Sequence, residues 1–95
     1  MKLQLILETV STTTGIAQEL VIGSSRKEEV ITARFLFFYL ANQHSNADYK
    51  KISSFVNRKD KTYYHALKKV QSWIECDKNF RALYETINNQ LSLYK

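Results

Sequence analysis

The stretch from residue 57 to residue 76 most constrains the fold of this chain, because a helical period gives it one apolar side and one basic side. Apolar residues recur at intervals of four, three and four positions: Tyr63, Leu67, Val70 and Ile74. At 3.6 residues per turn these side chains share one face of an α-helix, which should lie against a core. Basic residues fall on another side of the same helix: Arg58, Lys61, His65, Lys68 and Lys69.

The other segments also favour helices, and the chain has no proline and only two glycines to interrupt them. Patterning predicts helices over about 2–14, 26–43, 48–55 and 58–76, a short turn over 17–20, and a final helix from about residue 77. Threonines near residue 14 lower the helix propensity of the first segment, so a β-strand is the alternative prediction there. With 95 residues, of which 44% are hydrophobic, we expect one all-α domain over 1–95 around one core.

Two helix starts are predicted from the spacing of capping residues. Ser25 followed by Glu28 resembles a capping box, and Asn57 followed by Asp60 repeats this spacing. The final helix carries an apolar stripe, which we expect to pack internally rather than to form a partner surface. The stripe consists of Phe80, Leu83, Tyr84, Ile87 and Leu91.

Positive charge is concentrated in one part of the chain. The formal net charge is +5, and the segment 48–69 alone holds seven basic and two acidic residues, an excess of five. The basic residues are Lys50, Lys51, Arg58, Lys59, Lys61, Lys68 and Lys69. The basic face of the helix at 58–76 lies towards its N-terminal half, where the helix dipole also favours anions, so a phosphate backbone would suit this face.

The sequence of residues 56–66, Val-Asn-Arg-Lys-Asp-Lys-Thr-Tyr-Tyr-His-Ala, resembles a family motif. In the C-terminal DNA-binding domain (domain IV) of the bacterial replication initiator DnaA, the motif runs roughly Gly-Gly-Arg-Asp-His-Thr-Thr-Val-Leu-His-Ala, followed by two basic residues. The matching positions are Arg58, Thr62, His65, Ala66, Lys68 and Lys69. Upstream, residues 26–34 are similar to the family's basic loop and the start of its following helix. The resemblance implies a small bundle of the Trp-repressor-like superfamily, with a helix-turn-helix at about 48–76.

The same resemblance implies roles for individual residues on double-stranded DNA. The N-terminal end of the second helix would enter the major groove, where four residues would read bases: Lys59, Asp60, Lys61 and Thr62. Six residues would hold phosphates: Lys50, Lys51, Arg58, His65, Lys68 and Lys69. Arg26, assisted by Lys27, would reach into the adjacent minor groove.

This chain departs from the family at the positions that read bases. Lys59, Asp60 and Lys61 stand where the family has Asp-His-Thr, so we expect a different target sequence. The alternative for Asp60 is a role as a helix cap. The alternative for Lys59 and Lys61 is that they are solvent-exposed charges without a DNA contact. Tyr64 would either flank the groove or cover the edge of the core. Arg34 is expected to be structural, ion-paired within the bundle.

Several function classes are disfavoured by what the sequence lacks. There is no Gly-x-x-x-x-Gly-Lys-Ser/Thr loop, so the ATPase portion of the initiator is not expected here. A single cysteine, Cys76, excludes an intrachain disulfide and a zinc site built on cysteines. No pair of carboxylates and no nucleophile with a nearby base stands out, so we expect a non-enzyme without cofactor, metal or small-molecule substrate.

The expected protein is therefore a stand-alone DNA-binding regulator or replication accessory. The alternative is a helical protein-interaction module that kept the fold but lost base reading. The apolar run 35–41 is too short to span a bilayer, which takes roughly 20 residues, and the N-terminus does not read as a secretory signal. We expect a cytoplasmic, nucleoid-associated protein that does not act on membranes, with a monomer favoured.

Overall fold

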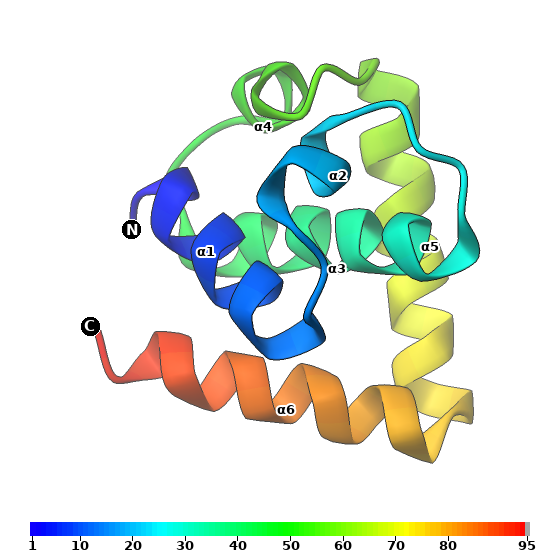
Figure 1. Ribbon diagram of the computed structural model, residues 1–95. Coiled ribbons are helices and arrows are strands. Elements are labelled where there is room, and N and C mark those ends of the chain that lie inside the picture. The colour runs from blue at the N-terminus through cyan, green and yellow to red at the C-terminus, as the bar shows by residue number, and fades with distance from the viewer. Residues whose placement is uncertain (95) are drawn as a thin grey trace.

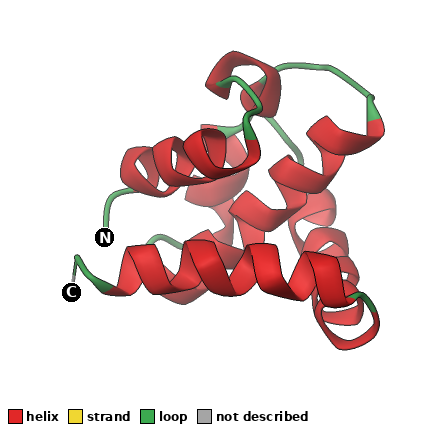
Figure 2. Cartoon of the chain, turned by 60° about the horizontal axis from the view of Figure 1, so that its bottom comes forward, coloured by secondary structure: helices red, strands yellow, loops and turns green. Residues whose placement is uncertain are grey.

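The computed structural model describes residues 1–94, and within that range the chain forms six α-helices and no strand. They are α1 (Leu3–Thr14), α2 (Gln18–Ile22), α3 (Glu28–His44), α4 (Tyr49–Phe55), α5 (Asp60–Cys76) and α6 (Lys78–Ser92). Figures 1 and 2 show them arranged as a small bundle with short connections. The predicted all-α fold is confirmed, and the first segment, for which a β-strand was the alternative, forms the helix α1.

Helix α3 is the central element of the bundle and contacts each of the other five helices. Its apolar residues point in several directions, as expected for a helix that is covered on most sides. Phe37, Phe38, Leu36 and Leu40 are all fully buried. In Figure 1 the helix passes behind α1 and α2, and α5 crosses it.

Helix α6 buries its apolar stripe, which confirms the prediction that the stripe belongs to the core. Phe80, Ile87 and Leu91 are buried, and Leu83 and Tyr84 pack against the same cluster. The Trp73 ring of α5 lies edge-on to Phe80, with the ring centroids 5.3 Å apart. Contacts with α1 and α5 hold α6 across the bottom of the bundle in Figure 1.

The helix caps differ from the predicted ones. Asp48 caps α4 by accepting from the Lys51 amide at 2.9 Å, and Asp77 caps α6 by accepting from the amides of Asn79 and Phe80. The Ser25–Glu28 capping box is wrong, because α3 begins after Lys27 and no side chain caps it. The Asn57–Asp60 cap is also wrong, since α5 begins only at Asp60 and Lys59 occupies the cap position.

The two ends of the described chain lie on one side of the bundle. Figures 1 and 2 both show the N-terminal end of α1 near the C-terminal end of α6. The N-terminal half of α5 lies at the opposite side in Figure 1.

A buried tyrosine should make the fold sensitive to alkaline pH. Tyr63 is 5% exposed and donates to Asn42 Oδ1 at 2.7 Å, and burial, with a smaller contribution from Tyr64, raises the pKa of its hydroxyl. Because folding raises this pKa, the stabilisation contributed by the neutral Tyr63 hydroxyl is fully present below about pH 10, the pKa of tyrosine in the unfolded chain. It is lost as the pH rises through the higher pKa of the folded protein. Melting temperatures between about pH 7 and 11 should therefore fall less for Tyr63→Phe than for the parent. The exposed Tyr94→Phe is the matched control and should follow the parent.

Candidate nucleic-acid interface

Helices α4 and α5 are the two helices of a helix-turn-helix, and residues 56–59 form the turn between them. Asn57 allows this tight turn, because its φ of 54° lies in the left-handed region that asparagine tolerates better than most residues. The buried side chain of Val56 and the stacked rings of Phe55 and Phe37, 5.7 Å apart, fix α4 on the core. The start of α5 is thereby held in one orientation.

The basic residues of α5 face solvent together. Lys61, His65, Lys68 and Lys69 are all exposed, whereas the predicted apolar positions face the core: Tyr63 and Val70 are buried, and Leu67 and Ile74 are half-buried against it. The predicted separation of an apolar and a basic face is confirmed for these residues. Lys59 is also exposed, and Asp60 and Thr62 are half-buried at the start of the helix.

A shallow hollow of about 410 Å³ lies at the N-terminal end of this basic face. It is lined by Lys59, Lys61, Thr62 and His65 from the turn and α5, and by Phe35 from α3. The Phe35 ring meets His65 edge-on at 5.7 Å and stacks on Trp73 at 6.0 Å, so it is fixed in place. Phe35 is half-buried against the core cluster, and only the packing of α3 beside α5 places it at this surface.

The first turn of α5 has no side-chain cap. The Lys59 side chain makes no capping bond, and Asp60 is the first helical residue, which places its carboxylate near the positive end of the helix dipole. The capping alternative for Asp60 is therefore wrong.

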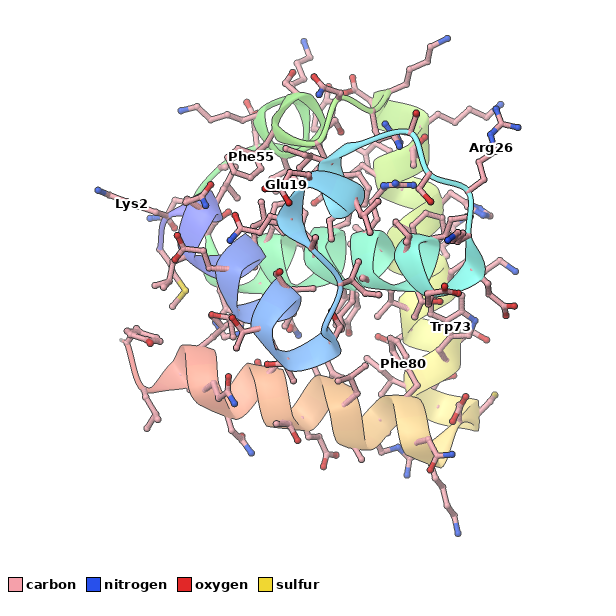
Figure 3. All side chains as sticks on the ribbon, viewed as in Figure 1. Lys2, Glu19, Arg26, Phe55, Trp73 and Phe80 are labelled. Carbon is pink, nitrogen blue, oxygen red and sulfur yellow. The ribbon has the colours of Figure 1, made fainter. Side chains whose placement is uncertain are left out.

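The loop between α2 and α3 carries two exposed cations, Arg26 and Lys27. In Figure 3 the Arg26 side chain extends away from the bundle on the side where α5 begins. The loop and the turn before α5 are directly connected, because Arg58 donates to the carbonyl of Gly23.

Arg58 differs from the other predicted phosphate ligands. It is only half-exposed, and its Nη1 donates to the carbonyls of Val56 at 3.3 Å and Asn57 at 3.1 Å. Its Nη2 donates to the Gly23 carbonyl. Much of this guanidinium is thus directed at the protein's own backbone.

Arg34 is structural, as predicted, but the predicted ion pair is wrong. The side chain is 4% exposed and donates to backbone carbonyls of α2 and the loop that follows. Nε donates to Val21 at 2.7 Å, and Nη2 donates to Leu20, Gly23 and Ser25 at 3.0 to 3.2 Å. Burial lowers the pKa of Arg34, and the nearby charge of Arg58 lowers it further.

Helix α4 presents Lys50 and Lys51 to solvent. Next to them lies an aromatic group in which Tyr49 is 5.6 Å from Tyr64 and 6.0 Å from the Lys50 ammonium. Tyr64 is 51% exposed and also meets Tyr63 edge-on at 5.2 Å. It therefore covers the core edge with one side of its ring and leaves the other side open.

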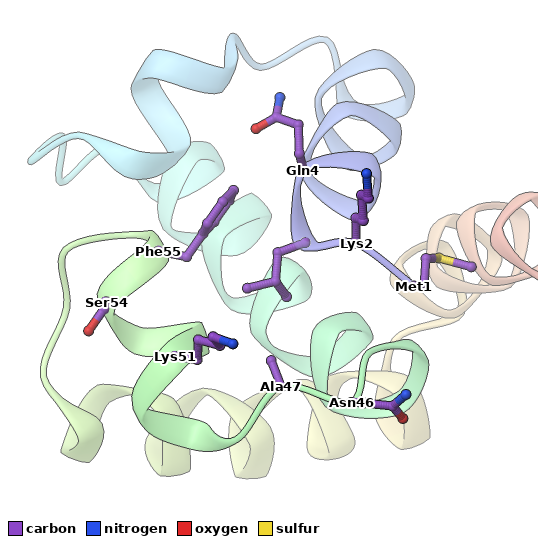
Figure 4. Close-up of a pocket in the computed structure, with 9 residues that line it drawn as sticks. Met1, Lys2, Gln4, Asn46, Ala47, Lys51, Ser54 and Phe55 are labelled. Atoms are coloured by element: carbon purple, nitrogen blue, oxygen red, sulfur yellow. The ribbon is translucent and has the colours of Figure 1, made fainter.

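A larger hollow of about 750 Å³ lies elsewhere, between the start of α1 and α4 (Figure 4). Its apolar lining comes from Met1, Leu3, Ala47 and Phe55, and Lys51 is the one predicted DNA-contacting residue among the residues that line it. It contains no arrangement of catalytic side chains, and in residues 1–94 no group of three or more His, Cys, Asp or Glu residues is suited to hold a metal ion. Within the same range, no helix combines the length and apolar character needed to cross a membrane.

Comparison with known proteins identifies similar sequences along most of this chain. The family model described as the bacterial DnaA protein helix-turn-helix matches residues 3–70. The chromosomal replication initiator protein DnaA of Bacteroides fragilis is 43% identical over 68 residues, which are 70% of this chain and 14% of that protein. The DnaA protein of Bacteroides thetaiotaomicron is 34% identical over 87 residues, 90% of this chain and 18% of that protein. The chain thus spans less than a fifth of the length of these relatives.

Proposed function

The chain belongs to the bacterial DnaA helix-turn-helix family, and from this membership we propose that it binds double-stranded DNA with the N-terminal half of α5 in the major groove. The observation that carries the proposal is the single outward face formed by Lys61, His65, Lys68 and Lys69, directly after the turn of the helix-turn-helix. In this motif the second helix contacts base edges with its N-terminal residues.

Base reading is assigned to the start of α5. Lys59 and Lys61 offer only donors, which suit guanine O6 and N7, whereas Asp60 accepts from cytosine N4. Thr62 lies beside them in the same hollow as Lys59 and Lys61. This set differs from the Asp-His-Thr of the family motif, so the preferred sequence is proposed to differ as well.

Phosphate contacts are assigned to exposed cations on α5 and on α4. Lys68, Lys69 and His65 lie further along α5, and Lys50 and Lys51 lie on α4, all exposed. Such contacts fix the register of the protein on DNA without reading sequence. Arg26 and Lys27 are assigned to the adjacent minor groove, where arginine favours the narrow width of A·T-rich DNA.

The proposed biological role is that of a DNA-binding regulator or replication accessory that acts on the nucleoid as a monomer. No ATP-binding loop is present in the 95 residues, so the segment is proposed to act through DNA contact alone, without catalysis. The second candidate, a protein-interaction module, is favoured by one observation: Lys59, Asp60 and Lys61 differ from the Asp-His-Thr of the family motif at the base-reading positions.

Selection of bound duplexes from a random oligonucleotide pool tests the proposal. Enrichment of one short sequence would support base reading by α5. A pool that stays random, together with weak binding to every duplex, would favour the protein-interaction module.

Substitutions on α5 should separate base reading from phosphate contact. On the selected duplex, Lys59→Ala or Asp60→Ala should change which bases are preferred, by about 1–3 kcal/mol per contact. Lys68→Ala and Lys69→Ala should instead weaken binding to all duplexes alike. Competition binding with single-base variants of the selected site measures both effects. If all four variants lose affinity uniformly, the assignment of roles is wrong.

A further inference from the structure

We propose that Arg58 is a positioning residue, which fixes the loop that carries Arg26 against the turn that begins α5. Its guanidinium would set the spacing between the minor-groove contact and the major-groove contact, rather than bind a phosphate. This inference rests on the proposed function and adds to it a role that the family motif alone does not assign.

The contacts of Arg58 join two segments that are far apart in the sequence. Its Nη1 donates to Val56 and Asn57 on the turn before α5, and its Nη2 donates to Gly23, 35 positions away in the loop between α2 and α3. One planar guanidinium thus bridges the turn and the loop. Three hydrogen bonds from two of its nitrogens make this bridge.

Arg34 fixes the other side of the same loop. It donates to Gly23 at 3.0 Å and to Ser25 at 3.2 Å, so the Gly23 carbonyl accepts from both arginines. Ser25 directly precedes Arg26. The path of the loop up to Arg26 is therefore set by α3 through Arg34 and by the helix-turn-helix through Arg58.

Gly23 is suited to this junction because it has no side chain. A Cβ at this position would lie 2.7 Å from the carbonyl oxygen of Glu19, which is closer than van der Waals contact allows. The backbone at Gly23 therefore lies close to the end of α2, and the Gly23 carbonyl faces the guanidinium groups of Arg34 and Arg58.

Lysine is a poor replacement for Arg58 in this role. A bridge to three carbonyls requires the planar, forked donors of a guanidinium, whereas an ammonium is a compact point charge. A phosphate ligand, by contrast, tolerates lysine well. This difference allows the two roles of Arg58 to be separated by experiment.

The test uses the duplex selected by the protein, with adenines in its A·T-rich flank replaced by 2,6-diaminopurine. This base adds an amino group in the minor groove, where G·C pairs carry one, and leaves the major-groove edge of adenine unchanged. The parent protein should bind the substituted duplex about tenfold more weakly, which corresponds to the loss of one base contact. Arg26→Ala should bind both duplexes equally.

Arg58→Ala and Arg58→Lys should both behave like Arg26→Ala, with a penalty for diaminopurine of less than about twofold. The double variant Arg26→Ala/Arg58→Ala should bind no more weakly than the weaker single variant, because both changes remove the same contact. Circular dichroism and melting curves identify variants that remain folded, and Arg58→Lys retains the charge if Arg58→Ala does not fold.

Two results would overturn the inference. If Arg58→Lys restores binding and retains the full diaminopurine penalty, Arg58 is a phosphate ligand. If the parent shows no penalty for diaminopurine, the loop makes no minor-groove contact for Arg58 to position. A parent protein that binds no duplex would instead contradict the proposed function itself.

Discussion

Raising the salt concentration from 50 to 200 mM should lower the affinity of the protein for duplex DNA by about a thousandfold. Neutralised phosphates release counterions, and the logarithm of the binding constant falls with the logarithm of salt concentration with a slope of about −0.9 per phosphate for B-DNA. Six exposed cations are assigned to the backbone or the minor groove: Arg26, Lys27, Lys50, Lys51, Lys68 and Lys69. A slope of about −5 follows.

Matched lysine variants make this measurement specific to the proposed face. Lys68→Ala should reduce the magnitude of the slope by about one, because it removes one phosphate contact. Lys2→Ala is the control, since Lys2 is exposed at the start of α1 and lies across the molecule from Arg26 in Figure 3. Fluorescence anisotropy with a labelled duplex at several salt concentrations gives the slopes. A slope near zero for the parent would favour the protein-interaction module.

Arg34→Leu should destabilise the fold by about 2–4 kcal/mol, a large share of the roughly 5–15 kcal/mol that holds a domain together. The reason is that the guanidinium satisfies carbonyls of α2 and the following loop, and each buried acceptor left without a donor costs about 1–3 kcal/mol. Val21 and Ser25 would lose the donors that Arg34 provides, while Gly23 would keep Arg58. The melting temperature should fall by at least about 8 °C.

Arg26→Ala provides the control for this effect, because it removes an exposed arginine from the adjacent loop. Its free energy of unfolding should stay within about 0.5 kcal/mol of the parent value. Urea denaturation of the three proteins measures the differences. An Arg34→Leu variant as stable as the parent would mean that water replaces the guanidinium at these carbonyls.

The apolar pattern was sufficient to predict the helices and the buried faces of α5 and α6. Intervals of three and four residues place Tyr63 and Val70 on the buried side of α5, and the same rule holds for Phe80, Ile87 and Leu91 on α6. These predictions succeed because burial of apolar side chains follows the period of the helix itself. Helix ends were predicted less well, since Asn57 takes a left-handed conformation instead of capping α5.

Residues whose partners are distant in the sequence could not be assigned from the pattern. Arg34 was expected to form an ion pair, yet its partners are carbonyls 9 to 14 positions earlier that come together only through the packing of α2 on α3. Phe35 has an apolar side chain like its neighbours, and its place beside His65 depends on where α5 crosses α3. Local sequence contains no signal for either arrangement.

The placement of both chain ends on one side of the bundle bears on how this domain is connected to other polypeptides. The starts and ends of domains that lie together at the surface tolerate fusion, insertion and circular permutation. A fluorescent protein or affinity tag joined before α1 or after α6 would emerge away from the beginning of α5. The same geometry allows the domain to be linked in tandem copies, or inserted as a unit into a host protein, with its basic helix still accessible.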